Sequence, residues 1–133
     1  MALDVVGSTT FGGPPSPRFI PGLGTAKRPA IVDESVIDEL IMVPEAAAIR
    51  MCRYLAYRGY LLGGSTGTVL SGAEYRLAGI AQAVTSVAIS PDFGERYLDS
   101  VYDDDWTSEH YGIELTSTPH PGRMQRTARR NAQ

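Results

Sequence analysis

Hydrophobic positions run together in some parts of the chain and recur every three to four residues in others. Short runs rich in β-branched residues are typical of strands, and the longer period is typical of helices that bury one face. The pattern predicts strands over residues 2–6, 36–43 and 84–89 and helices over 44–57 and 65–80. Strands that alternate with helices indicate an α/β fold with parallel strands, and we interpret 84–89 (VTSVAI) as a buried strand.

A glycine-rich turn lies at the centre of this pattern. The apolar run at 60–62 leads into Gly63-Gly64-Ser65-Thr66-Gly67, where the second predicted helix begins. Glycines let the backbone approach a flat or anionic ligand, and Ser65 is suited to cap the helix because its oxygen can accept from first-turn amides. A tight connection with a capping serine explains the same residues without a ligand, so both interpretations stay open. A Walker-type phosphate loop is disfavoured, because it requires a lysine here and the chain's one lysine is Lys27.

Residues 7–29 contain five prolines and five glycines, which is too many for a regular element. Apolar residues such as Phe19 and Ile20 can anchor the segment, so we expect an ordered loop, with a linker as the alternative. Within it, Gly22 and Gly24 could let main-chain amides approach a ligand.

Composition and charge narrow the function classes. The chain has 133 residues, of which 43% are hydrophobic, and this suits one domain with a core. It shows no apolar run of membrane-spanning length and no signal peptide, so we expect a cytoplasmic protein. The single cysteine, Cys52, lies in a helical pattern and is expected in the core. Residues 1–114 carry a charge of −7 and residues 115–133 carry +4, so we expect a basic, disordered tail rather than a nucleic-acid site.

Two segments follow predicted strands at the edge where open α/β sheets bind ligands. They are the glycine turn and residues 90–94. The acidic run Asp103-Asp104-Asp105 would suggest a metal, but adjacent carboxylates do not easily converge on one ion. We therefore predict a solvated acidic turn there and no metal site.

Three segments together resemble one enzyme family: residues 21–24 (PGLG), 62–67 (LGGSTG) and 91–98 (PDFGERYL). Their order and spacing are similar to the C-terminal part of the fold type II pyridoxal-phosphate enzymes, which include cysteine synthase and cystathionine β-synthase. The resemblance covers residues 2–106. It implies an α/β, parallel-sheet, three-layer domain of the tryptophan synthase β-like class, incomplete in this chain. Within the family the chain looks closest to the synthases that make N-(2-amino-2-carboxyethyl)-L-glutamate, the precursor of 2,3-diaminopropionate.

The resemblance assigns roles to residues of this chain. Those expected to hold the cofactor, pyridoxal 5'-phosphate, are Gly63, Gly64, Ser65, Thr66 and Asp92. Ser65 matches the serine whose hydroxyl hydrogen-bonds the pyridine nitrogen, and a neutral group suits that place because a carboxylate would keep the nitrogen protonated. Gly22 and Gly24 match the loop over the active-site mouth, whose main chain faces the incoming nucleophile.

The resemblance also shows what this chain lacks. The family's Schiff-base lysine lies in an N-terminal Ser-x-Lys context that is absent here, and Lys27 does not match it. The asparagine loop for the substrate carboxylate and the loop that cradles the cofactor phosphate are absent too. No catalytic residue is therefore assigned to this chain.

Our first interpretation is a split enzyme, supported by a first strand that begins with no sheet encoded before it. An N-terminal partner chain would supply the lysine and the phosphate loop, and the two chains would share the cofactor in a hetero-oligomer built on a dimer. The implied reaction is β-replacement on O-phosphoserine or O-acetylserine through an aminoacrylate, with an amine, glutamate, as nucleophile. The alternatives are thiol transfer of the cysteine synthase kind, an inactive homologue that acts as an interaction or regulatory subunit, and a truncated product.

Overall fold

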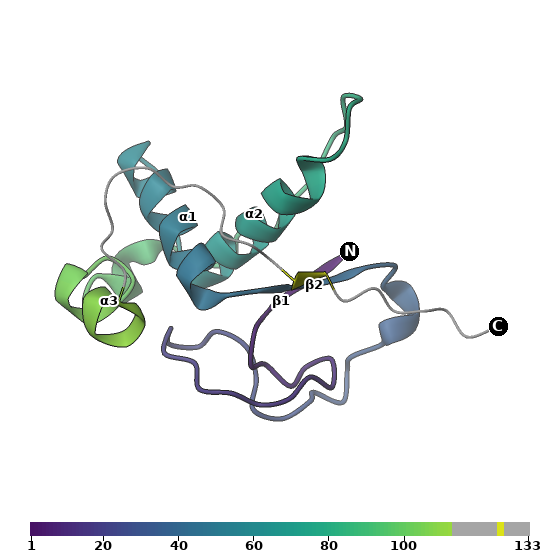
Figure 1. The fold of residues 1–133 in the computed structure, drawn as a ribbon, viewed down its shortest axis with the longest axis horizontal. Coiled ribbons are helices and arrows are strands. Elements are labelled where there is room, and N and C mark those ends of the chain that lie inside the picture. The colour runs from purple at the N-terminus through teal and green to yellow at the C-terminus, as the bar shows by residue number, and fades with distance from the viewer. Residues whose placement is uncertain (113–124, 127–133) are drawn as a thin grey trace.

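The computed structural model describes residues 1–112 and 125–126 and places two long helices beside a small sheet (Figure 1). The strands, in sheet order, are β1 (Ala2–Val5), β2 (Leu40–Val43) and β3 (Gln125–Arg126). β1 and β2 are parallel, with Val5 opposite Val43, and β3 is antiparallel to β2. The predicted α/β fold with parallel strands is confirmed. The predicted tail lies outside the described residues, apart from the backbone of β3.

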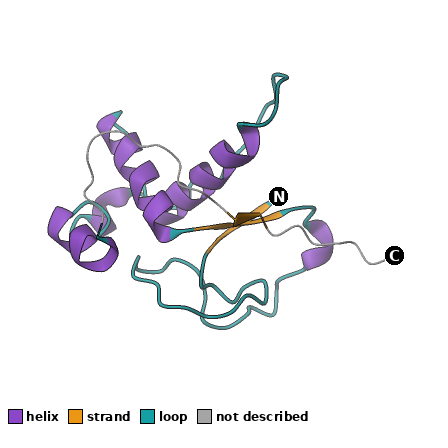
Figure 2. Cartoon of the chain, in the orientation of Figure 1, coloured by secondary structure: helices purple, strands orange, loops and turns teal. Residues whose placement is uncertain are grey.

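Two long helices follow β2 in the chain, and three shorter helices complete the described fold (Figure 2). The long helices are α1 (Glu45–Tyr57) and α2 (Gly64–Leu77), and the short ones are η1 (Glu34–Val36), η2 (Gly94–Tyr97) and α3 (Asp104–Tyr111). The start of α1 after Pro44 and its end before Gly59, which has φ +92°, agree with the local signals in the sequence.

The two long helices approach each other closely because small residues lie between them. A Cβ on Gly67 of α2 would come within 2.3 Å of the Ala48 carbonyl oxygen on α1. The hydroxyl of Ser71 donates to the carbonyl of Ala47 at 3.0 Å, which adds a buried hydrogen bond across the same contact. This packing fixes the first turn of α2 relative to α1.

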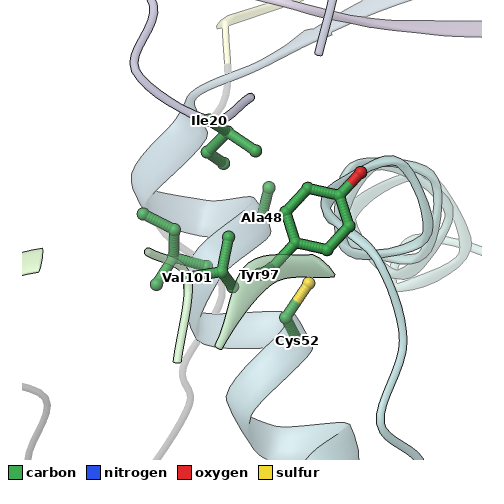
Figure 3. Packing of buried hydrophobic residues seen from close by; sticks show 6 residues of the cluster. Ile20, Ala48, Cys52, Tyr97 and Val101 are labelled. Carbon is green, nitrogen blue, oxygen red and sulfur yellow. The ribbon is translucent and has the colours of Figure 1, made fainter. Parts of the chain in front are cut away.

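The larger core cluster joins the 7–29 loop to the helices (Figure 3). Its buried members are Ile20, Ala48, Ile49, Cys52, Tyr97 and Val101. Cys52 is fully buried, and burial raises the pKa of its thiol to about 12, so the prediction of a core cysteine is confirmed. A second cluster joins Ile41 and Val43 of β2 to Ala47 of α1.

The predicted strand over 84–89 is wrong for this structure. The segment forms no strand, and Val84, Val87 and Ile89 are 52%, 90% and 79% exposed. A strand needs a neighbour for its peptide groups, and within residues 1–112 none of those of 84–89 makes a backbone hydrogen bond. The predicted strand over 36–43 is shorter for the same reason, since only Leu40–Val43 pairs with β1.

The acidic run begins α3 instead of forming an isolated turn. Asp103 accepts from the Trp106 amide at 2.7 Å and so caps the helix, and Asp104 pairs with Arg53 of α1. Among the residues that the structure describes, no group of three or more His, Cys, Asp or Glu is arranged to hold a metal ion. No helix in the described part is long and apolar enough to cross a membrane.

Candidate functional site

The glycine turn and residues 90–94 lie against each other at the start of α2. The Gly63 amide donates to the Asp92 carbonyl at 3.1 Å, and the Thr66 and Ser90 hydroxyls are 2.8 Å apart. A single antiparallel bridge joins Leu62 to Phe93, so the apolar run before the turn contributes a bridge rather than a full strand. Two segments that the sequence singled out separately therefore form one site.

Ser65 does not cap α2, which corrects the prediction. The helix begins one residue earlier, with Gly63 as its N-cap and no side-chain cap hydrogen bond. The Gly63 carbonyl already accepts from the Thr66 amide at 3.0 Å and the Gly67 amide at 3.3 Å. Ser65 is half-buried in the first turn, and its hydroxyl makes no hydrogen bond to any described residue. That hydroxyl is therefore unengaged within the described part of the chain.

Asp92 explains why residue 63 is a glycine. A Cβ at position 63 would lie 2.0 Å from Asp92 Oδ1, which no side chain tolerates. The Tyr97 hydroxyl donates to Asp92 Oδ2 at 2.6 Å, while Oδ1 is buried and has no hydrogen-bond partner in the described part. Burial and the neighbouring Asp92 carboxyl raise the pKa of Tyr97 to about 12, so the phenol stays protonated as the donor.

The 7–29 loop reaches the same place through Ile20. A Cβ on Gly64 would come within 2.7 Å of Ile20 Cγ2, so the loop covers the first residue of α2. The next loop residues include Gly22 and Gly24, whose φ angles of +72° and +69° favour glycine. Gly22 is exposed with open space around it, whereas Gly24 packs against Val5 and Ser8. Their predicted role toward a nucleophile stays a prediction.

Glu45 holds this loop in place, a role that sequence reasoning missed. Its carboxylate is buried at the start of α1 and accepts from the amides of Phe19 and Ile20, both at 2.9 Å, and from the Tyr111 hydroxyl at 2.8 Å. Burial and Glu45 raise the pKa of Tyr111 well above its ordinary value. The sequence signal was an acid at a helix N-terminus, which explains its dipole contact but not these distant donors.

Lys27 and Thr66 differ in whether a neighbouring side chain engages them. Lys27 is exposed in the loop, and no described residue pairs with it. The Thr66 hydroxyl is engaged by Ser90. Among the five residues predicted to hold a cofactor, the structure therefore brings all five to one place and leaves the Ser65 hydroxyl open there.

Comparison with known proteins identifies relatives of this chain. No family model matches the chain. It is 43% identical over 107 residues to N-(2-amino-2-carboxyethyl)-L-glutamate synthase of Ralstonia nicotianae, a match that covers 80% of this chain and 32% of that protein. The chain thus spans about a third of the length of this curated relative.

Solved structures agree with that result. O-ureido-L-serine synthase is 32% identical with a TM-score of 0.66, and the match covers 76% of this chain and 33% of that one. Cysteine synthase of Entamoeba histolytica is 26% identical with a TM-score of 0.69, covering 89% and 33%. O-acetylserine dependent cystathionine β-synthase of Helicobacter pylori is 28% identical with a TM-score of 0.65, covering 73% and 32%. The chain is a homologue, of about one third length, of the fold type II pyridoxal-phosphate enzymes of the cysteine synthase and cystathionine β-synthase family.

Proposed function

We propose that this chain supplies the side of a pyridoxal-phosphate site that binds the pyridine nitrogen, in an enzyme of β-replacement. The observation that carries the proposal is the Ser65 hydroxyl in the first turn of α2, which no described residue engages and which follows the Gly63–Asp92 contact. A hydroxyl can donate to an unprotonated pyridine nitrogen, and Gly63 and Gly64 let Asp92 and Ile20 pack tightly against the turn that carries this hydroxyl.

The residues of the turn fit this cofactor. Pyridoxal phosphate supplies an electron sink that lets the β-substituent of a bound amino acid leave. In this chain Ser65 would orient the ring through its nitrogen, while the Thr66–Ser90 and Asp92–Tyr97 contacts keep the turn in shape. A neutral partner for the nitrogen limits the electron sink, which suits loss of a β-substituent rather than racemisation.

The lysine that binds the cofactor comes, in our proposal, from a separate N-terminal chain. Lys27 is the only lysine in this chain, it is exposed in the 7–29 loop, and it does not match the Ser-x-Lys context of the family. The remaining two thirds or so of the family fold would bring that lysine and the phosphate-binding loop. The two chains would form a hetero-oligomer built on a dimer.

The substrate proposal follows the relative with 43% identity. That protein is named for N-(2-amino-2-carboxyethyl)-L-glutamate, so we propose glutamate as the amine nucleophile and O-phosphoserine or O-acetylserine as the amino acid that loses its β-substituent. Sulfide is the competing nucleophile, since a cysteine synthase has a similar structure. Product analysis with glutamate and sulfide present together separates the two.

Co-expression with a lysine-bearing partner tests the proposal. The probe is the part of the Ralstonia synthase that this chain does not match, produced together with this chain in the presence of pyridoxal phosphate. We expect the visible absorbance of lysine-bound cofactor only when both chains are present, and no change with Lys27→Arg. If the complex forms without that absorbance, the inactive interaction subunit becomes the better account.

A further inference from the structure

The segment 84–89 (VTSVAI) carries three large apolar side chains and is exposed over its whole length. Every residue from 81 to 90 is exposed, including Val87 at 90% and Ile89 at 79%. Beyond the end of α2 the chain extends away from the sheet before it returns (Figure 1). Other exposed apolar residues, such as Ile31 and Val36, stand singly in the loop or in a short helix. Among the residues that the structure describes, three exposed large hydrophobic residues fall within six positions only at 84–89.

The backbone of this segment is also unpaired. Within residues 1–112, no peptide group of 84–89 makes a backbone hydrogen bond. A β-branched run with a free row of N–H and C=O groups is a template on which another strand adds. Both the side chains and the main chain of 84–89 therefore lack the contacts that a strand of this composition needs.

The segment leads directly into the candidate site. Ser90, the next residue, bonds to Thr66 in the first turn of α2, and Asp92 accepts from the amide of Gly63. A strand that adds to 84–89 would therefore end close to Ser65. Docking at 84–89 would act on the cofactor site through the contacts of Ser90 with Thr66 and of Asp92 with Gly63.

We propose that 84–89 is the edge to which the lysine-bearing N-terminal chain docks, by adding one of its strands. This inference rests on the proposed function, which requires such a chain. The comparison suggests the occupant: this chain matches 32% of the Ralstonia relative, and the part of that relative that it does not match is our candidate to cover the apolar edge. Docking buries Val84, Val87 and Ile89 and brings the partner's residues to the α2 turn.

The test is co-expression of this chain with the complementary part of the Ralstonia synthase, with variants at matched exposure. Val87→Lys places a charge in the proposed interface, and Ile31→Lys places it on a residue that is equally exposed, at 91%. We expect Val87→Lys to weaken the complex at least about tenfold by sedimentation, because a buried unpaired charge is costly. Ile31→Lys should leave the affinity unchanged, and the amides of 84–89 should gain protection from hydrogen exchange in the complex.

Each outcome decides something. Unchanged affinity in Val87→Lys, or amides of 84–89 that stay unprotected in the complex, would contradict docking at this edge. If the same complex shows the absorbance of lysine-bound cofactor, the proposed function still holds. A complex that is weakened by Val87→Lys but never shows that absorbance supports docking and contradicts the proposed function. Protection of 84–89 in this chain alone, with a doubled mass, assigns the edge to a second copy, and failure of any complex to form contradicts both proposals.

Discussion

The amide of Gly63 donates to the carbonyl of Asp92, and the carboxyl group of Asp92 fills the space where a side chain at position 63 would begin. The turn before α2 and residues 90–94 therefore pack closely against each other. Because Tyr97 holds the other carboxyl oxygen, Asp92 cannot move aside without losing a hydrogen bond. The start of α2, where Ser65 lies, depends on this contact.

Gly63→Ala should destabilise the chain by about 1–3 kcal/mol, because its Cβ would overlap Asp92 Oδ1. Urea unfolding measures the change in the free energy of unfolding. Gly79→Ala is the matched control: no atom lies within 4 Å of its Cβ position, and the residue does not have a positive φ. Equal stability of the two variants would show that Asp92 can move away from position 63 at little cost in free energy.

Ser65→Ala should weaken cofactor retention in the reconstituted pair and slow loss of the β-substituent, by up to about 1–3 kcal/mol if the ring nitrogen is left without a donor. Fluorescence titration of pyridoxal phosphate and turnover measure the two effects. Ser108→Ala, on the exposed face of α3, should change neither. Wild-type retention and turnover in Ser65→Ala would remove Ser65 from the site.

Glu45→Gln should loosen the 7–29 loop, because the carboxylate accepts from Phe19, Ile20 and Tyr111 and an amide offers only one acceptor oxygen. We expect faster hydrogen exchange at the Phe19 and Ile20 amides and a loss of about 1–3 kcal/mol in unfolding. Glu109→Gln on α3, where the glutamate is exposed, serves as the control. Unaltered exchange at both amides would show that Ile20 is held by packing alone.

Stability should fall as the pH rises from about 9 toward 12. The folded state raises the pKa of Cys52 from 9.0 to about 12 and that of Tyr97 from 10.0 to about 12. Above pH 9 the unfolded chain releases protons that the folded chain keeps, so unfolding becomes more favourable. Urea midpoints between pH 7 and 11 measure this loss, and Cys52→Ala should reduce its steepness. A midpoint independent of pH over that range would contradict burial of both groups.

Local signals in the sequence predicted the elements whose stability is local. Pro44 and Gly59 bracket α1 as expected, and the position of Cys52 in the helical pattern places it in the core. Contacts from distant segments explain the misses. Gly63 rather than Ser65 is the N-cap of α2, at a turn that Asp92 holds, and Glu45 accepts hydrogen bonds from a loop far away in sequence.

The failed strand at 84–89 has a different cause. Its composition is that of a buried strand, but the described part of the chain offers no neighbour for its peptide groups. The pattern of residues shows that a segment is suited to pair as a strand. It does not show whether a neighbouring strand is present. The mismatch between pattern and exposure is itself the reason to look for a docking partner.

The most direct test of the account is to locate the cofactor covalently. The co-expressed pair is reduced with borohydride, which makes the bond between lysine and pyridoxal phosphate permanent, and the labelled peptide is identified by mass spectrometry. The account predicts a label on a lysine of the N-terminal chain, dependent on the presence of this chain, and none on Lys27. A label on Lys27, or a label on the N-terminal chain that forms equally well without this chain, would contradict it.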